Sequence, residues 1–306
     1  MAIAKLTIGV EIMNTRAQIA LLPDGRRLHL HDGPIDLIIE AFGSKREVQS
    51  AYAAAAGRFA TILDELCSEL PLLRQAAGLS GPRLRGVVAR RMLDAVLPYA
   101  ADTFITPMAA VAGAVAEEIQ SAMTGAADLS RAYVNDGGDI ALHMNSGEEF
   151  QIGMIERPDR SSLFGTAKLC ASDPVRGIAT SGWRGRSFSL GIADAVTVLA
   201  ESASAADAAA TIIANAVDLP DHPAITRVPA CEIAPDSDLG ARLVTQSVGQ
   251  LSHEEVALAL DFGVSTARNL LDRGLICAAG LHLQGETCVV GSSSLKLLAS
   301  RSLAHA

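Results

Sequence analysis

Polar and apolar positions alternate near the N-terminus, which is the pattern of strands with one buried face. Leu6–Val10 and Ala17–Leu22 are short apolar runs, and the turn residues 23–25 separate the second run from the alternating segment RRLHLH. Runs of this kind around turn residues predict an antiparallel meander. His29 and His31 share one face of the last strand. Their spacing is compatible both with two half-exposed histidines and with a metal site.

Helical periodicity follows the meander. Apolar residues recur every three or four positions over residues 47–77, which predicts a long helix that breaks around Pro71. Residues 92–101 predict a second helix or a buried segment, and residues 106–123 predict a third helix with Pro107 in its first turn. One face of this third helix carries almost only alanine and glycine. Such a face favours either tight packing against another helix or close approach of a ligand or ion to the backbone.

The middle of the chain returns to strand patterns. Ala132–Leu142 predicts two strands joined by a glycine turn, and Phe150–Met154 predicts a further strand that ends in the loop ERPDRSS. The segment AVTVLA, residues 195–200, predicts a central buried strand. The pattern S-x-x-D at residues 204–207 predicts the start of a helix that reaches about Val217.

The C-terminal part has its own pattern. A capping box at Ser252–Glu255 predicts one helix, residues 265–272 predict a second short helix between two glycines, and residues 275–291 predict two strands joined at residues 284–286. The last dozen residues read as a frayed tail. We expect residues 1–230 to form one α+β domain and residues 231–306 to form an appended C-terminal α+β lobe.

Composition and charge exclude several classes of protein. The 306 residues are 49% hydrophobic and only 4% aromatic, so the core should consist of small aliphatic side chains. A net charge of −9 argues against a nucleic-acid partner. Five dispersed cysteines predict free thiols rather than disulfides or a zinc site. The lack of a secretory leader and of a membrane-length apolar run predicts a soluble, cytoplasmic protein without a membrane partner.

Residues 177–217 concentrate the chemically specific groups. Asp207 and Thr211 lie four positions apart, so a carboxylate and a hydroxyl share one helix face. Oxygen ligands of this kind suit a hard cation such as Mg²⁺. The same spacing also fits an ordinary capping role, in which Asp207 interacts with the positive end of its own helix.

Arginines follow the turn Thr180-Ser181-Gly182 in the same stretch. Arg184 and Arg186 flank a glycine, and arginine forks beside exposed backbone amides suit a phosphate or a carboxylate. Surface salt bridges explain the two arginines equally well. Trp183, the single tryptophan, would stack on a planar ligand or belong to the core. The stretch therefore predicts a pocket for a small anionic ligand, and by the resemblance described below that ligand is a nucleotide.

Five ordered blocks resemble the ApbE superfamily of flavin-handling proteins. These blocks are AYVNDGGDIAL, IGMIERP, GIATSG, AVTVLA and ADAAATII, and the upstream segment TPMAAVAGAVAEE is similar to the small-residue helix of that superfamily. The match covers roughly residues 106–217, and the whole chain is most similar to a bacterial and archaeal branch. The resemblance implies an α+β fold with a T-fold-like mixed sheet and packed helices.

The resemblance also implies ligands. ApbE enzymes bind FAD and use magnesium to transfer an FMN moiety to a threonine or serine of a target protein, and some hydrolyse FAD to FMN and AMP. By this resemblance Mg²⁺ and FAD or FMN are the expected cofactors, with metal ligands at Asp207, at Thr211 and at the backbone carbonyl near Ala112. Residues expected near the nucleotide are Asn135, Gly137, Gly138, Asp139, Thr180, Ser181, Gly182 and Trp183.

The chain departs from the transferases in two places. They carry a longer segment with a histidine, implicated in the transfer, between the A-T-S-G turn and the V-T-V strand. Here WRGRSFSLGIAD fills that position without a histidine, and Gly113 stands where a lysine is expected. Binding and proton transfer are separate demands on a site, so a cofactor pocket can persist without a general base.

Three functions remain open at this point. The first is a magnesium-dependent enzyme that cleaves or transfers across the FAD pyrophosphate, with Arg184 and Arg186 stabilising the developing phosphate charge. The second is a non-catalytic protein that binds a flavin or a small anion and delivers it to a redox-enzyme partner. The third is an enzyme that acts on an unrelated small substrate in the same pocket. A homo-oligomer is compatible with all three.

Overall fold

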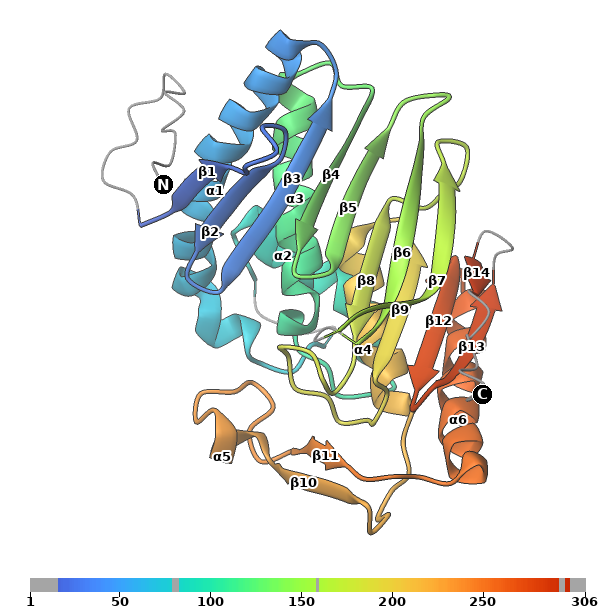
Figure 1. Cartoon of the computed structure of the whole chain (residues 1–306). Helices are drawn as coiled ribbons and strands as arrows, with labels where there is room; N and C mark the ends of the chain where they lie inside the picture. Colours follow the sequence, from blue (N-terminus) through green and yellow to red (C-terminus); the bar gives the residue numbers. More distant parts are fainter. Residues whose placement is uncertain (1–15, 79–82, 158–159, 292–294, 298–306) are drawn as a thin grey trace. The chain divides into compact units, whose positions relative to one another are not determined.

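A computed structural model describes residues 16–78, 83–157, 160–291 and 295–297 (Figure 1). The chain divides into two compact units. The first comprises Met1–Glu148, Arg176–Ala179 and Glu201–Ala208, and the second comprises Glu149–Val175, Thr180–Ala200 and Ala209–Ala306. Strand β8 (Gly177–Ser181) and helix α4 (Ala203–Ala216) each begin in the first unit and continue into the second.

The first unit is built on an antiparallel sheet. Its strands, in sheet order, are β1 (Gln18–Leu21), β2 (Leu28–Asp32), β3 (Ile35–Phe42), β4 (Arg131–Asp136) and β5 (Asp139–Met144). The start of β8 pairs with β5 at Ile178 and Ile140. The predicted meander and the glycine-turn hairpin are confirmed, while the prediction for Leu6–Val10 lies outside the described residues.

Helices cover one face of this sheet (Figure 1). They are α1 (Lys45–Leu73), α2 (Val87–Val96) and α3 (Val111–Ala126), with the short 3₁₀ turns η1 (Leu97–Tyr99) and η2 (Pro107–Ala110) between the last two. Alternate strand residues such as Leu30, Leu37 and Ile39 meet Phe59 of α1 and Ile119 of α3 in a fully buried aliphatic core. Three helices form as predicted, with two differences: Pro71 lies inside α1, which ends two residues later, and α2 begins at Val87, five residues before the predicted segment 92–101.

The second unit contains three groups of strands. Strand β9 (Ala195–Ala200) pairs with β12 (Ala278–Leu283), and β12 pairs with β13 (Glu286–Gly291). A second sheet contains β6 (Glu149–Arg157), β7 (Arg160–Cys170) and β14 (Leu295–Leu297), and β10 (Ile225–Pro229) pairs with β11 (Leu243–Val248) beside the short α5 (Ala230–Ile233). All six residues of β9 are buried, as predicted for a central strand.

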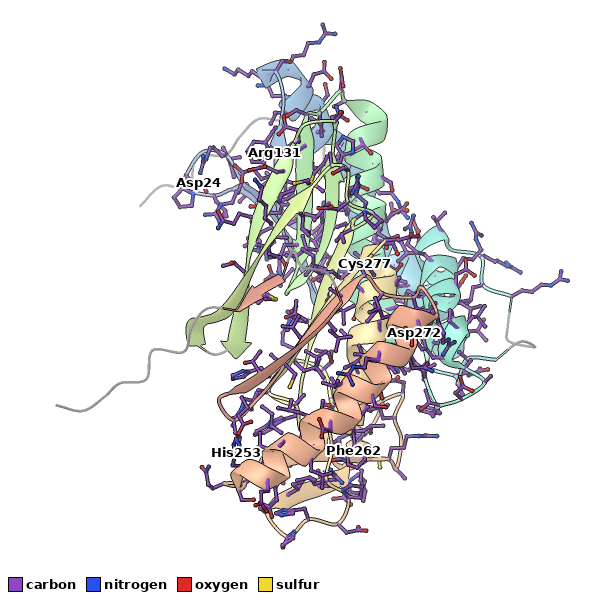
Figure 2. All side chains as sticks on the ribbon, turned by 90° about the vertical axis from the view of Figure 1, so that its right-hand side faces the viewer. Asp24, Arg131, His253, Phe262, Asp272 and Cys277 are labelled. Atoms are coloured by element: carbon purple, nitrogen blue, oxygen red, sulfur yellow. The ribbon has the colours of Figure 1, made fainter. Side chains whose placement is uncertain are left out.

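Three expectations for this unit need correction. The segment ERPDRSS is not a simple loop, because β6 and β7 extend through most of it. The two short C-terminal helices are one, α6 (His253–Asp272), which Figure 2 shows running from His253 past Phe262 to Asp272. Gly263 does not end this helix, because it packs there against Val217. The chain also does not divide after residue 230, since β12 lies between β9 and β13.

The architecture is that of an α+β protein. All five cysteines are free, as the sequence predicts. Within the described ranges, no helix is both long enough and apolar enough to cross a membrane.

Candidate functional site

Helix α4 carries the predicted metal residues and is largely buried. Its alanines at 203, 206, 208, 209 and 210 are fully buried, whereas Asp207 and Thr211 are each partly exposed, one helical turn apart. The helix starts two residues earlier than the S-x-x-D pattern predicts, because Ser202 replaces Ser204 as the capping serine and accepts the N–H of Ala205 at 3.2 Å. Asp207 therefore lies in the second turn of α4 and does not cap its own helix.

The carboxylate of Asp207 caps α3 instead. Its Oδ2 accepts the backbone N–H of Gly113 at 3.0 Å, and the N–H of Ala112 also interacts with the carboxylate. First-turn N–H groups lack partners within their own helix and lie at the positive end of its dipole, so a carboxylate is stabilised there. Ala112 lies beside Asp207, and the expected role of its carbonyl as a metal ligand stays a prediction. The two residues meet through the amide of Ala112, because the carbonyls of a helix point toward its C-terminus.

Helix α3 in turn supplies a carboxylate to the N-terminus of α4. The Oε1 atom of Glu117 accepts the N–H of Ser204 at 2.6 Å and its hydroxyl at 2.7 Å. Each helix thus supplies a carboxylate that caps the other. Ser204 takes part in capping, but as the residue that Glu117 binds rather than as the partner of Asp207.

Two glycines allow the start of α4 to approach this closely. A Cβ atom on Gly113 would lie 2.3 Å from the carbonyl oxygen of Ala203, and one on Gly177 would lie 2.0 Å from the carbonyl carbon of Ser202. Real side chains do not make contacts this short. The small-residue face of α3 is therefore filled by the backbone of α4. Position 113 has no room for the lysine that the transferases carry.

A second acid lies near Asp207. Burial raises the pKa of Asp207 to about 7; the N–H of Gly113 opposes this rise, and the negative charge of Asp136 adds to it. Asp136 ends β4 and is itself buried. It is not among the predicted site residues. The signal is the alternation along β4, which places Ala132, Val134 and Asp136 on the buried face.

The predicted nucleotide-side residues next to Asp136 form the β4–β5 turn. Gly137 and Gly138 have φ of 65° and 119°, and the side-chain oxygen of Asn135 accepts the N–H of Gly138 at 2.8 Å. Asp139 pairs with Asp136 at the end of the hairpin. The glycines thus serve a tight turn, and Asn135 stabilises it.

The oxygen donors around Asp207 fit magnesium. Two mutually repelling carboxylates, Asp207 and Asp136, would both gain from a nearby cation, and Thr211 offers a hydroxyl one turn along α4. In the described part of the chain, no group of three or more His, Cys, Asp or Glu side chains is placed to hold a metal. Magnesium needs no such cage, because it commonly keeps water and phosphate oxygens as ligands.

The histidine pair His29 and His31 is the other candidate for a metal. His29 hydrogen-bonds Asp36 at 2.8 Å, and these side chains are not among any group of three or more that could hold a metal in the described residues.

The second unit holds the predicted aromatic and cationic residues. The guanidinium of Arg184 lies 4.1 Å above the ring of Trp183, and its Nε donates to Asp194 at 2.6 Å. The other carboxylate oxygen of Asp194 accepts the N–H of Gln284 at 2.7 Å. Arg184 is therefore held in an ion pair whose buried acid, Asp194, the sequence does not single out. Arg186 is exposed.

The turn before Trp183 is also tied into the second unit. The Thr180 hydroxyl lies 2.9 Å from that of Thr197, and a Cβ atom on Gly182 would meet the Asp194 carbonyl oxygen at 2.5 Å. Ser181 is half-buried. The indole Nε1 of Trp183 is buried and has no hydrogen-bond acceptor among the described residues. A buried N–H of this kind is costly unless water or a ligand accepts it.

The family model described as "AbpE bacteria" matches residues 19–289. The chain belongs to this family. Membership confirms the resemblance that the ordered sequence blocks carry. It does not by itself assign an activity to the chain.

The chain is also similar to curated relatives. A UPF0280 protein of Methanothermobacter thermautotrophicus is 40% identical over 119 residues, which cover 38% of this chain and 44% of the relative. One from Methanopyrus kandleri is 37% identical over 129 residues, 42% of this chain and 48% of the relative. The chain thus spans about half the length of the curated relatives it matches.

The flavinyl transferase ApbE of Pseudomonas stutzeri, in its apo form, is similar in structure with a TM-score of 0.42 and 12% identity, covering 93% of this chain and 97% of that chain. The flavin transferase ApbE of Vibrio cholerae has a TM-score of 0.38 and 13% identity, covering 88% and 98%. We draw no correspondence between residues from these two structures.

Proposed function

We propose that this chain is a magnesium-dependent flavin-nucleotide-binding protein in which Asp207 is the metal carboxylate. The observation that carries the proposal is the partly exposed Asp207, held at the start of α3 beside a second buried acid. Asp207 and Thr211 would hold the ion, with Asp136 in electrostatic range. When bound, magnesium would neutralise phosphate oxygens of the nucleotide. Family membership supports a flavin as that nucleotide.

The residues predicted to contact the nucleotide stay proposals in each unit. In the first unit, the turn of Asn135 to Asp139 follows directly after the buried acid Asp136. In the second unit, Trp183 offers an aromatic ring and an N–H without an acceptor, next to the predicted residues Thr180, Ser181 and Gly182. Arg184 and Arg186 would add positive charge for phosphate oxygens.

Cleavage across the FAD pyrophosphate is the reaction we propose for the site. In this reaction water would attack one phosphorus of the pyrophosphate and the bond from that phosphorus to the bridging oxygen would break, which releases FMN and AMP. Arg184, Arg186 and a magnesium ion held by Asp207 would stabilise the developing phosphate charge without a histidine. The protein's own part is to bind and orient the pyrophosphate.

A second candidate is a non-catalytic flavin or small-anion carrier that serves a redox-enzyme partner. Two observations favour it. Arg184 is already paired with Asp194, and position 113 has no room for a lysine. Both observations reduce the number of groups available to move a proton.

Tryptophan fluorescence tests the binding proposal. Trp183 is the single tryptophan, so FAD is titrated with and without MgCl₂ while the tryptophan emission is followed. We expect quenching that strengthens with magnesium, together with thermal stabilisation. Neither effect at high flavin would contradict the proposal. FAD incubated with magnesium is then analysed by chromatography: AMP that is formed by the wild type and lost in Asp207→Asn supports the enzyme, and intact FAD supports the carrier.

A further inference from the structure

The reciprocal capping of α3 and α4 extends into a chain of ion pairs. Arg91 of α2 lies between two neighbouring glutamates of α3: its Nε is 3.0 Å from Glu117, and its Nη1 is 3.0 Å from Glu118. Arg58 of α1 donates to Glu118 at 2.6 Å and binds Glu65 through two hydrogen bonds of 2.8 Å. These contacts link α1 and α2 to α3, and Glu117 links α3 to the start of α4.

We propose that Glu117, held in place by Arg91, is the positioning residue for Asp207. This inference rests on the proposed function, in which Asp207 is the metal carboxylate. Glu117 accepts two hydrogen bonds from Ser204 in the first turn of α4, three residues before Asp207. Asp207 then returns to α3 at Gly113. These two contacts join α3 and α4 at two points, so the position of Asp207 depends on the hydrogen bonds that Glu117 makes to Ser204.

Burial and charge strengthen the ion pair that holds Glu117. The side chains of Glu117, Glu118 and Arg91 are 18%, 13% and 24% exposed, so solvent screens their ion pairs less than it screens pairs on the surface. Arg91 also donates to the carbonyl oxygen of Ala114 at 3.3 Å, which fixes the guanidinium against the first turns of α3. Arg91 therefore holds Glu117 in the orientation that reaches α4.

Residues that orient a metal ligand without touching the metal matter for affinity. Loss of such a partner typically weakens metal binding about 10- to 100-fold. The cause is geometric, because magnesium tolerates little departure from octahedral coordination. Removal of Glu117 would free the first turn of α4 and with it the carboxylate of Asp207.

The first test measures Mg²⁺ binding to the full chain by calorimetry. Glu117→Ala should weaken binding about 10-fold or more, while Glu117→Gln, which keeps an acceptor for Ser204 but loses the ion pair with Arg91, should lose less. Arg91→Met should weaken binding and Arg91→Lys should restore most of it. Glu118→Gln is the matched control, because Glu118 binds the same arginine without touching α4. Equal effects of the Glu117 and Glu118 variants would overturn the proposal.

The second test needs no metal. Amide hydrogen exchange at Gly113 reports whether Asp207 still accepts this N–H. In Glu117→Gln and Glu117→Ala, exchange at Gly113 should accelerate relative to Ile119 in the middle of the same helix, and in Glu118→Gln it should not. Unchanged protection of Gly113 in both Glu117 variants would overturn the positioning role. A wild-type chain that binds no Mg²⁺ would contradict the proposed function instead, and the exchange result would still decide the role of Glu117.

Discussion

The carboxylate of Asp207 and the backbone N–H of Gly113 meet at 3.0 Å although 94 positions separate them in the chain. This contact places the predicted metal acid of α4 at the N-terminus of α3. There the helix dipole stabilises its negative charge, and the acid Asp136 opposes it. A carboxylate that a helix dipole stabilises and a neighbouring acid repels is placed to bind a cation.

Gly113→Ala should destabilise the protein. A Cβ atom at this position would lie 2.3 Å from a backbone oxygen of α4, and backbone cannot move aside as a flexible side chain can. Overpacking of this kind costs about 1–3 kcal/mol, which urea denaturation would detect. Gly125→Ala in the same helix is the control. Its Cβ would meet nothing within 4 Å, so the replacement should be neutral or stabilising. Equal stability of the two variants would contradict the packing described for α4.

The stability of the metal-free protein should carry a pH signature of Asp207. Folding raises the pKa of this carboxyl from 3.8 to about 7, so the folded state favours its protonated form. Its contribution to the free energy of unfolding is therefore fully present below pH 3.8 and is lost as the pH rises through about 7. Asp207→Asn should lack this loss. The free energy of unfolding of both proteins is measured by denaturation in the presence of a chelator across this pH range. Parallel plots of this free energy against pH for wild type and variant would argue against the raised pKa.

Asp194→Asn should destabilise the second unit. It removes the buried charge that pairs with Arg184, while the N–H of Gln284 can still be accepted by the amide oxygen. Loss of one member of a buried pair costs about 2 kcal/mol or more. Lys168→Gln serves as the control, because its ion pair with Glu149 is exposed on both sides. Thermal unfolding compares the two variants. A shift no larger than that of the control would mean that Asp194 does not organise the Trp183 loop.

Local patterns predict much of this fold from the sequence. The buried strand β9, the long helix α1 and the glycine turn of the β4–β5 hairpin follow from hydrophobic periodicity and turn residues close together in the chain. The helix that places Asp207 and Thr211 on one face also follows from local spacing, while their role as metal ligands stays a prediction. These features depend on neighbours within a few residues, which a single sequence contains.

The remaining features depend on contacts between distant segments. No local signal says that Asp207 caps α3 rather than its own helix, or that Glu117 caps α4 in return. Gly263 reads as a helix end, yet it is a packing position against Val217. Asp194 reads as the end of a loop, although its partners include Gln284, far along the chain. Only the folded chain brings these groups together.

The role of Asp207 as a metal carboxylate is tested most directly by Mg²⁺ calorimetry on wild type and Asp207→Asn at pH 8. Asparagine keeps the size of the side chain and can still accept the N–H of Gly113, so the fold should survive and only the charge is lost. At pH 8 the carboxyl of Asp207 lies above its raised pKa and is mostly ionised, so little proton release should accompany binding. We predict measurable binding to the wild type and binding weakened at least 10-fold in the variant. Equal Mg²⁺ affinity of the two proteins would contradict the account.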